Sequence, residues 1–156
     1  MGMQNMLVGL LSDTHGTLPE GVFEAFAGVD YIIHAGDIGC ESVLWELEAI
    51  APTLACLGNN DWQDYGSAVR HEIHPIIGGA KIAVTHYPED AAVLARTGEY
   101  QLVVHGHTHV PRDIVAGSCR VINPGSTTRP RGGSTRQCCT LRINNGVIGD
   151  LSTHLL

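Results

Sequence analysis

The sequence predicts an α/β fold with mixed sheets, folded as a single domain that covers residues 1–156. Strand-like and helix-like segments alternate through the first two thirds of the chain, which is typical of α/β folds. Antiparallel hairpin patterns follow beyond residue 110. A chain of 156 residues with 44% hydrophobic and 16% charged residues is large enough to bury a core of its own. This composition excludes a disordered chain, a coiled coil and a collagen-like repeat.

Short apolar runs rich in Val, Ile and Leu predict buried strands. These runs occupy residues 7–11, 31–35, 53–57, 81–85 and 102–105. Segments with helical spacing of apolar residues lie at residues 19–27, 41–50 and 88–96. Pro19 and Pro88 suit the first turn of a helix, where no backbone N–H is needed. The alternation predicts βαβ units whose parallel strands are covered on both faces.

Hairpins are predicted at three further places. Residues 73–77, followed by Gly78-Gly79, predict a first arm that returns into the strand at residues 81–85. Two C-terminal hairpins are expected to pair residues 113–115 with 119–122 and residues 140–143 with 147–151. The intervening residues 125–133 are rich in Gly, Ser, Thr, Pro and Arg, which predicts a long surface loop.

Charge is distributed unevenly along a chain whose formal net charge is −7. Residues 1–110 hold 3 basic and 14 acidic residues, whereas residues 111–156 hold 6 basic and 2 acidic residues. The acidic balance disfavours nonspecific nucleic-acid binding. Arg129, Arg131 and Arg136 form a basic segment that either binds an anionic group or is simply solvated.

Cysteine usage and the N-terminus indicate a cytoplasmic location. The five cysteines show no paired spacing, which predicts a reduced protein. No run approaches the ~20 apolar residues of a membrane span, and the N-terminus lacks the basic residues of a signal peptide. No contact with a membrane is therefore expected, and the formation of a homo-oligomer is left open.

A side chain able to bind a metal ion follows each of the five predicted strands. These side chains are Asp13, His15, Asp37, Asn59, His86, His107 and His109. Ligands of α/β folds bind at the carboxyl ends of strands, where loops converge. Carboxylates and imidazoles crowded into one crevice would repel each other or compete for protons unless a cation lay between them.

Each donor also has a simpler interpretation when it is taken alone. A single Asp after a strand is more often a turn or helix cap, and a single His is more often a hydrogen-bonded structural residue. The pair His107-x-His109 is a stronger signal, because residues two apart in an extended segment point the same way. The pattern as a whole predicts a metal site, whereas His34 and His105, which lie inside strands, are expected to support it or to belong to the core.

The blocks Asp13-x-His15, Gly36-Asp37, Gly58-Asn59-x-Asp61, His86 and Gly106-His107-x-His109 resemble the signature of the calcineurin-like metallophosphoesterases. The stretch Asn123-Pro124-Gly125-Ser126 is similar to one in the small YfcE-type phosphodiesterases. The resemblance implies a four-layer α/β/β/α sandwich and a hydrolase that acts on a small phosphoester, in particular a phosphodiester. A nucleic acid is then expected only as a hydrolysed substrate. It also implies two divalent ions as cofactors, with manganese as the first expectation and iron, zinc, nickel or cobalt as alternatives.

The resemblance further implies how the site is divided. One ion would be held by Asp13, His15, Asp37 and His109, and the other by Asp37, Asn59, His86 and His107. Asp37 would bridge the ions, and a hydroxide shared between them would attack phosphorus in line. Asn60 occupies a position where many members carry a His that protonates the leaving group, and an amide cannot transfer that proton. Asp37, Asn60 and Asp61 are the expected catalytic residues, with Asp61 orienting Asn60 or a metal-bound His.

A non-catalytic protein on the same fold is the alternative. The retromer subunit related to these enzymes is a scaffold, and this chain could bind a partner without turnover. All seven ligand positions carry competent side chains, and this completeness favours the enzyme.

Overall fold

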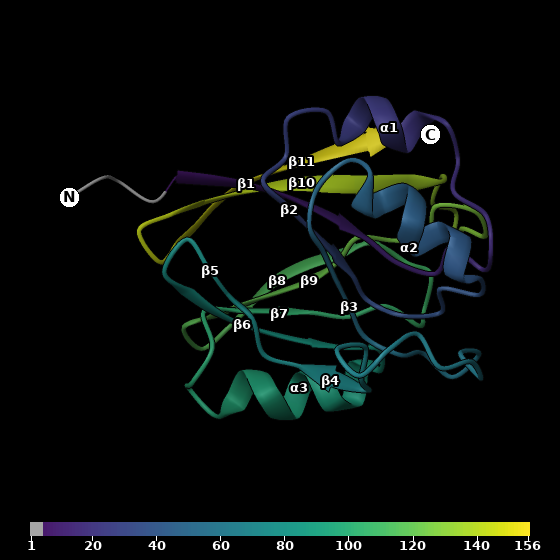
Figure 1. Ribbon diagram of the computed structural model, residues 1–156. Coiled ribbons are helices and arrows are strands. Elements are labelled where there is room, and N and C mark those ends of the chain that lie inside the picture. The colour runs from purple at the N-terminus through teal and green to yellow at the C-terminus, as the bar shows by residue number, and fades with distance from the viewer. Residues whose placement is uncertain (1–4) are drawn as a thin grey trace.

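The computed structural model describes residues 5–156, which form two mixed sheets packed face to face (Figure 1). The first sheet contains β1 (Asn5–Leu11), β2 (Tyr31–His34), β3 (Thr53–Ala55), β10 (Gln137–Asn144) and β11 (Val147–Leu155). The second contains β4 (Glu72–Ile73), β5 (Ile76–Ile77), β6 (Ala80–Thr85), β7 (Leu102–Val104), β8 (Arg112–Ala116) and β9 (Cys119–Asn123). The strand orders are β11-β10-β1-β2-β3 and β4-β6-β7-β9-β8, with β5 paired to β6.

Helices cover the outer faces of the two sheets. The helices α1 (Gly21–Ala25) and α2 (Glu41–Glu48) pack on the first sheet, and α3 (Pro88–Arg96) packs on the second (Figure 1). The expected α/β class with mixed sheets is therefore confirmed. No helix within residues 5–156 has the length and apolar character needed to cross a membrane.

The core is divided by the alternation of side chains along each strand. Leu10 of β1 and Ile33 of β2 point into the layer between the sheets, whereas their neighbours Leu11 and Ile32 point toward α1 and α2. In β6, Val84 likewise belongs to the central layer. Because each central strand is buried on both faces, these strands appear in the sequence as continuous apolar runs.

Most predicted elements are present, with shifts at their ends. The predicted strand at residues 53–57 ends at Ala55, and Cys56 makes only an isolated bridge with Arg70. The predicted arm at residues 73–77 is split into β4 and β5 because Pro75 has no N–H to continue the ladder, although its carbonyl still accepts from Ile82. The helix expected at residues 19–27 is limited to Gly21–Ala25.

The antiparallel part of the first sheet joins the two ends of the chain. The central strand β1 lies parallel to β2 on one side and antiparallel to β10 on the other, with Leu7 opposite Arg142 and Leu10 opposite Cys139. The C-terminal hairpin is longer than predicted, because β10 and β11 pair from Gln137 to Leu155. The first sheet is thus completed only by the last residues of the sequence.

Parallel strands bring their carboxyl ends to one end of the molecule. The strands β1, β2 and β3 are parallel neighbours in the first sheet, and β6 and β7 are parallel neighbours in the second. The loops after them are joined by backbone hydrogen bonds from Asp13 N to Gly36 O (3.0 Å) and from Gly106 N to His86 O (3.1 Å). Across the sheets, His107 N donates to Asp13 Oδ2 at 3.2 Å. The loops that carry the predicted donors therefore meet.

Candidate metal centre

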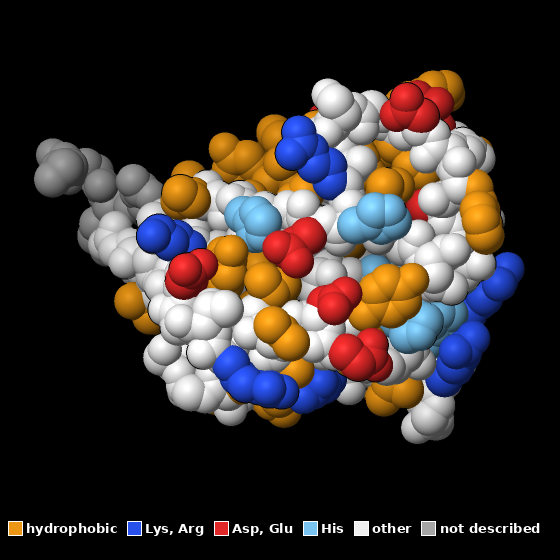
Figure 2. All heavy atoms as spheres, turned by 90° about the horizontal axis from the view of Figure 1, so that it is seen from below, with side chains coloured by type: hydrophobic (Ala, Val, Ile, Leu, Met, Phe, Trp, Pro, Cys, Tyr) orange, Lys and Arg blue, Asp and Glu red, His pale blue; other side chains and the backbone are white. Residues whose placement is uncertain are grey.

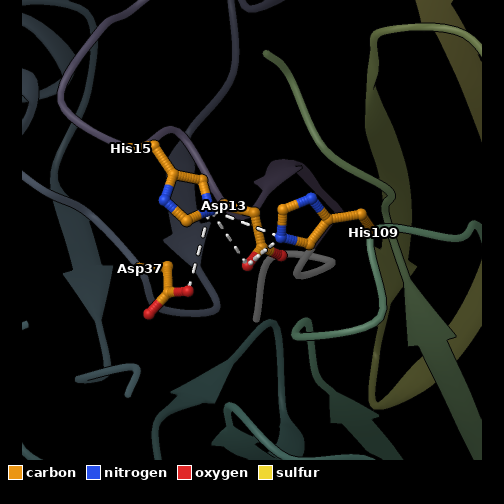
Figure 3. A group of neighbouring side chains, drawn as sticks. All are labelled: Asp13, His15, Asp37 and His109. Atoms are coloured by element: carbon orange, nitrogen blue, oxygen red, sulfur yellow. Dashed lines mark hydrogen bonds and ion pairs between the residues drawn. The ribbon is translucent and has the colours of Figure 1, made fainter. Parts of the chain in front are cut away.

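The side chains of the first group of predicted donors converge on one point. Asp13 and His15 follow β1, Asp37 follows β2 and His109 follows β7, and one donor atom of each lies within 4.8 Å of the others (Figure 3). His109 Nε2 is 3.3 Å from Asp13 Oδ1, and His15 Nε2 is 3.7 Å from Asp37 Oδ2. Donors that bind one ion at about 2.0–2.2 Å lie about 3–3.5 Å apart, so these separations are close to those of a ligand shell.

The second group adjoins the first through Asp37. His86 Nε2 lies 3.5 Å from Asp37 Oδ2 and 3.7 Å from Asp13 Oδ1. His107 Nδ1 lies 3.2 Å from Asn59 Oδ1, and the His86 and His107 rings are 5.2 Å apart between centroids. Asp13 and His86 are fully buried, whereas Asn59 is exposed. The cluster is therefore closed on one side and open to solvent on the other.

The tautomers of two histidines show why this cluster needs a cation. His109 Nδ1 donates to Arg129 O at 2.6 Å, and His86 Nδ1 donates to Ala35 O at 2.8 Å, because a carbonyl can only accept. In each neutral ring the Nε2 lone pair then faces carboxylate oxygens. Asp13 Oδ1 and His86 Nε2 are buried without a hydrogen-bond partner among the described residues. Opposed acceptors of this kind are costly to bury, and a divalent ion between them removes that cost.

The titration behaviour of the cluster indicates the same need for positive charge. Burial disfavours the ionised form of Asp37, but the attraction of a protonated His86 and the hydrogen bonds from Asn60 outweigh it and hold the pKa of this carboxyl far below its ordinary value. The pKa of Asp13 is also lowered, since His109 and His86 outweigh its burial. Asp13 in turn raises the pKa of His109. The carboxylates are therefore ionised at neutral pH, and in the absence of metal they favour the protonated forms of His86 and His109 over the neutral rings.

Backbone strain is concentrated at these residues. Within residues 5–156, the non-glycine positions with positive φ are Asp13 (54°), His15 (49°), Asp37 (57°), His107 (75°), His109 (60°) and Asn145 (49°). Such conformations are uncommon outside glycine and persist where surrounding contacts enforce them. The loops therefore direct the donor side chains toward one point, and this arrangement raises the conformational energy of the local backbone.

Two glycines leave room for the carboxylates. A Cβ on Gly58 would lie 2.2 Å from Asp37 Oδ1, and a Cβ on Gly106 would lie 2.1 Å from Ser12 Oγ and 2.7 Å from Asp13 Oδ2. Only glycine permits this approach of the loops to the acidic side chains.

Asn60 and Asp61 support the cluster rather than face it directly. Asn60 donates from its backbone N to Asp37 Oδ1 at 2.9 Å and from Nδ2 to Asp37 Oδ2 at 3.0 Å. The Asp61 carboxylate accepts from the backbone N–H groups of Gly58 (2.8 Å), Gly39 (3.0 Å) and Ile38 (3.2 Å), and from the Tyr65 hydroxyl (3.4 Å). The turn that joins Asp61 N to Gly58 O directs this carboxylate at backbone amides, and the role of Asp61 in orienting Asn60 or an imidazole stays a prediction.

Several supporting residues escaped prediction from the sequence. Ser12 Oγ donates to Asp13 Oδ2 at 2.7 Å, and Ser126 Oγ donates to Asp13 O at 2.9 Å. The ring of Tyr87 lies against His107 at 5.0 Å between centroids. In the sequence, the hydroxyl residues that follow Asn123-Pro124-Gly125, namely Ser126 and Thr128, are a signal of such a role.

Comparison with known proteins agrees with this geometry. The profile described as the calcineurin-like phosphoesterase superfamily domain matches residues 6–146. A probable metallophosphoesterase of Methanocaldococcus jannaschii is 38% identical over 144 residues, covering 81% of this chain and 70% of that protein. The solved structure of a novel archaeal phosphodiesterase superposes with a TM-score of 0.82 at 27% identity, covering 97% of this chain and 100% of the other. Vps29 of Entamoeba histolytica, solved with zinc, has a TM-score of 0.76 at 18% identity and covers 97% and 98%, respectively, which shows a shared fold.

Proposed function

This chain belongs to the calcineurin-like phosphoesterase superfamily, a family of metal-dependent hydrolases, and from that premise we propose that it is a phosphodiesterase with two metal ions. The observation that carries the proposal is the pair of buried atoms Asp13 Oδ1 and His86 Nε2, which lie 3.7 Å apart among the other donors and have no hydrogen-bond partner within residues 5–156. The relative named for phosphodiesterase activity in a solved structure favours diesters over monoesters.

The proposed ligand sets share Asp37. Asp13, His15, Asp37 and His109 would hold one ion, and Asp37, Asn59, His86 and His107 the other. Each carboxylate oxygen of Asp37 accepts one hydrogen bond from Asn60 and keeps a lone pair for a cation. When bound, two divalent ions activate a water molecule and neutralise charge that develops on the phosphoryl oxygens.

The remaining residues position these donors. Asn60 holds both oxygens of Asp37, and the backbone carbonyls of Ala35 and Arg129 fix the tautomers of His86 and His109. The exposed side of the cluster, near Asn59 and Asn60, is where a phosphoester can enter from solvent. Nδ2 of Asn60 donates to Asp37, and an amide transfers no proton, so we assign no side chain as the acid that protonates the leaving group.

The test is hydrolysis of bis(p-nitrophenyl) phosphate by protein supplied with manganese, beside elemental analysis of the purified protein. We expect turnover and two equivalents of divalent ion, with iron, zinc, nickel and cobalt tried in parallel. The Asp37→Ala variant should lose both ions and the activity, whereas Asn59→Ala should lose mainly one ion.

Asp150→Ala is the matched control, because Asp150 is exposed and distant in sequence from every proposed ligand. Two full equivalents retained in Asp37→Ala would refute the shared role of Asp37. Metal binding without turnover of diesters, monoesters or nucleotides would favour the alternative of a non-catalytic binding protein.

A further inference from the structure

A basic loop borders the metal centre. Residues 124–136 connect β9 to β10, and this basic loop carries Arg129, Arg131 and Arg136. They are three of only nine Lys and Arg residues in a chain with a net charge of −7. A concentration of positive charge on one loop of an acidic protein creates a local field that attracts anions.

Hydrogen bonds fasten this loop to two of the proposed ligands. Ser126 Oγ and Thr128 Oγ1 donate to the carbonyl of Asp13 at 2.9 Å and 3.2 Å. His109 Nδ1 donates to Arg129 O at 2.6 Å, and Arg131 N donates to His109 O at 3.2 Å. The backbone of both arginines is therefore held against the group formed by Asp13, His15, Asp37 and His109.

The side chains of these arginines are unengaged. Arg129 and Arg131 are exposed, and neither guanidinium has a hydrogen bond or ion pair with any residue of the described part of the chain. Arg120 differs, because its guanidinium makes a two-pronged ion pair with Asp113. Figure 2 shows basic side chains beside histidines at the end of the molecule toward which β1 runs in Figure 1.

We propose that Arg129 and Arg131 form an anion subsite beside the metal centre. This subsite selects phosphodiesters in which the group that stays bonded to the reacting phosphate after cleavage carries a second phosphate. This inference rests on the proposed function, since the reacting phosphodiester would occupy the ions and leave the guanidinium groups for another anion. A planar guanidinium binds phosphate through paired N–H donors, which suits this role better than a diffuse charge.

The experiment compares two substrates that differ only in that second phosphate. Thymidine 5′-(p-nitrophenyl phosphate) is tested with and without a 3′-phosphate, so that the leaving group is the same. The proteins are the wild type, Arg129→Gln/Arg131→Gln, and Arg142→Gln as the control, because Arg142 is an exposed arginine of β10 opposite Leu7. Glutamine keeps the backbone groups that hold His109.

We expect the wild type to prefer the 3′-phosphorylated ester through a lower KM. The double variant should lose about tenfold of that preference, the order expected for two partly exposed charge-assisted contacts. Arg142→Gln should keep it. Raising the ionic strength from 0.05 to 0.5 M should weaken the preference of the wild type toward that of the double variant.

A binding measurement separates this inference from the proposed function. Thymidine 3′,5′-bisphosphate and thymidine 5′-monophosphate are titrated into each manganese-loaded protein by calorimetry. If no ester is hydrolysed but the bisphosphate preference follows the two arginines, the phosphodiesterase proposal fails and the subsite stands. The subsite is overturned if the preference for the bisphosphate survives the double substitution or is absent from the wild type. It is also overturned if the double substitution weakens the binding of both ligands equally.

Discussion

Single residues at the candidate metal centre adopt conformations that an isolated peptide would avoid. Asp13 and His15 have φ values of 54° and 49°, and Asp37 has 57°. Each such residue costs on the order of 1–3 kcal/mol of local backbone energy. Backbone hydrogen bonds from Asp13 N to Gly36 O and from His15 N to Asp37 O, both 3.0 Å, enforce these angles. The donors are therefore held in place before any ion arrives.

The contacts of Asn60 lead to a prediction about leaving groups. Because Asn60 Nδ2 donates to Asp37 Oδ2 and an amide transfers no proton, the rate should fall steeply as the leaving-group pKa rises. Asn60→His should flatten this dependence, raising the rate on poor leaving groups by at least about tenfold relative to good ones. The measurement is kcat/KM across a series of aryl methyl phosphates.

Asn60→Ala is the control for this series. It removes the side-chain contact to Asp37 without adding an acid, so it should lower all rates while keeping the steep dependence. A wild-type slope near zero, with the chemical step shown to limit the rate, would mean that another group already protonates the leaving oxygen.

His34 links acid stability to a buried hydrogen-bond chain. Gly36 N donates to His34 Nδ1 at 3.1 Å, His34 Nε2 donates to Thr14 Oγ1 at 2.9 Å, and Thr14 Oγ1 donates to Ile38 O at 2.9 Å. Burial lowers the pKa of His34 from 6.5 to about 4. Between these values the unfolded chain binds a proton that the native protein excludes, so stability falls as the pH is lowered through this range.

The expected loss is about 3 kcal/mol between pH 6.5 and pH 4 in the metal-free protein. Urea unfolding at a series of pH values measures it. His34→Asn keeps a donor and an acceptor without a titrating group, so its stability should depend less on pH in this window. Parallel curves for the two proteins would show that His34 is not the source.

The donors could be predicted from the sequence more completely than their supports. Each donor lies in the short segment that follows an apolar run, and Asp37, Asn59 and His107 come directly after a glycine, so the local pattern identifies them. The partners of Asp61 could not be predicted in this way, because they are backbone amides brought close by the path of two loops. The left-handed angle of His109 likewise depends on tertiary contacts and leaves no mark in composition.

Whole elements show the same division between local and tertiary causes. The strands and α3 follow from apolar periodicity and a first-turn proline, and they are found within a few residues of their predicted ends. The split between β4 and β5 follows from Pro75, a cause that is visible in the sequence although its effect on the ladder was not predicted. The early end of β3 has no local signal, and beyond it Cys56 pairs only with Arg70, a contact between segments that the sequence pattern does not reveal.

The loop after β3 gives a prediction at the scale of an element. A Cβ on Gly58 would lie 2.2 Å from Asp37 Oδ1 and 2.3 Å from Asp37 N, so Gly58→Ala must displace the loop after β2. We expect the variant to lose the metal content of at least one site and about 1–3 kcal/mol of stability, as overpacked cores do. Elemental analysis and thermal unfolding measure the two effects.

Gly117→Ala provides the comparison, because Gly117 has φ +64° and open space around its Cβ position. Its variant should lose stability through backbone strain alone and keep its metal content. Full metal content in Gly58→Ala would show that the loop can adjust without moving Asp37.

At the scale of the whole molecule, the candidate metal centre lies between the two sheets. Asp13 and Asp37 follow strands of the first sheet, and His86 and His107 follow strands of the second. An ion bound only by the native arrangement stabilises it by RT ln(1 + [L]/Kd), about 4 kcal/mol at 1,000 times Kd. Removal of the ions by chelation should therefore lower Tm by several degrees, as measured by calorimetry.

The Asp37→Ala variant serves as the reference for this measurement. Chelator should leave its Tm unchanged, because its sites are already empty. An unchanged Tm in the wild type, with metal loss verified by elemental analysis, would contradict the linkage between metal binding and folding.

The pairing of β1 with β10 has a consequence for folding during synthesis. As the chain emerges, β1 and β2 are available early, but one edge of β1 stays unpaired until β10 appears more than 120 residues later. Contacts of such high sequence separation form slowly, and an open apolar edge can pair with another chain in the meantime. Ser126 and Thr128, which hold the carbonyl of Asp13, also arrive late. A nascent chain that ends before these residues therefore contains the donor side chains but lacks the contacts that orient them.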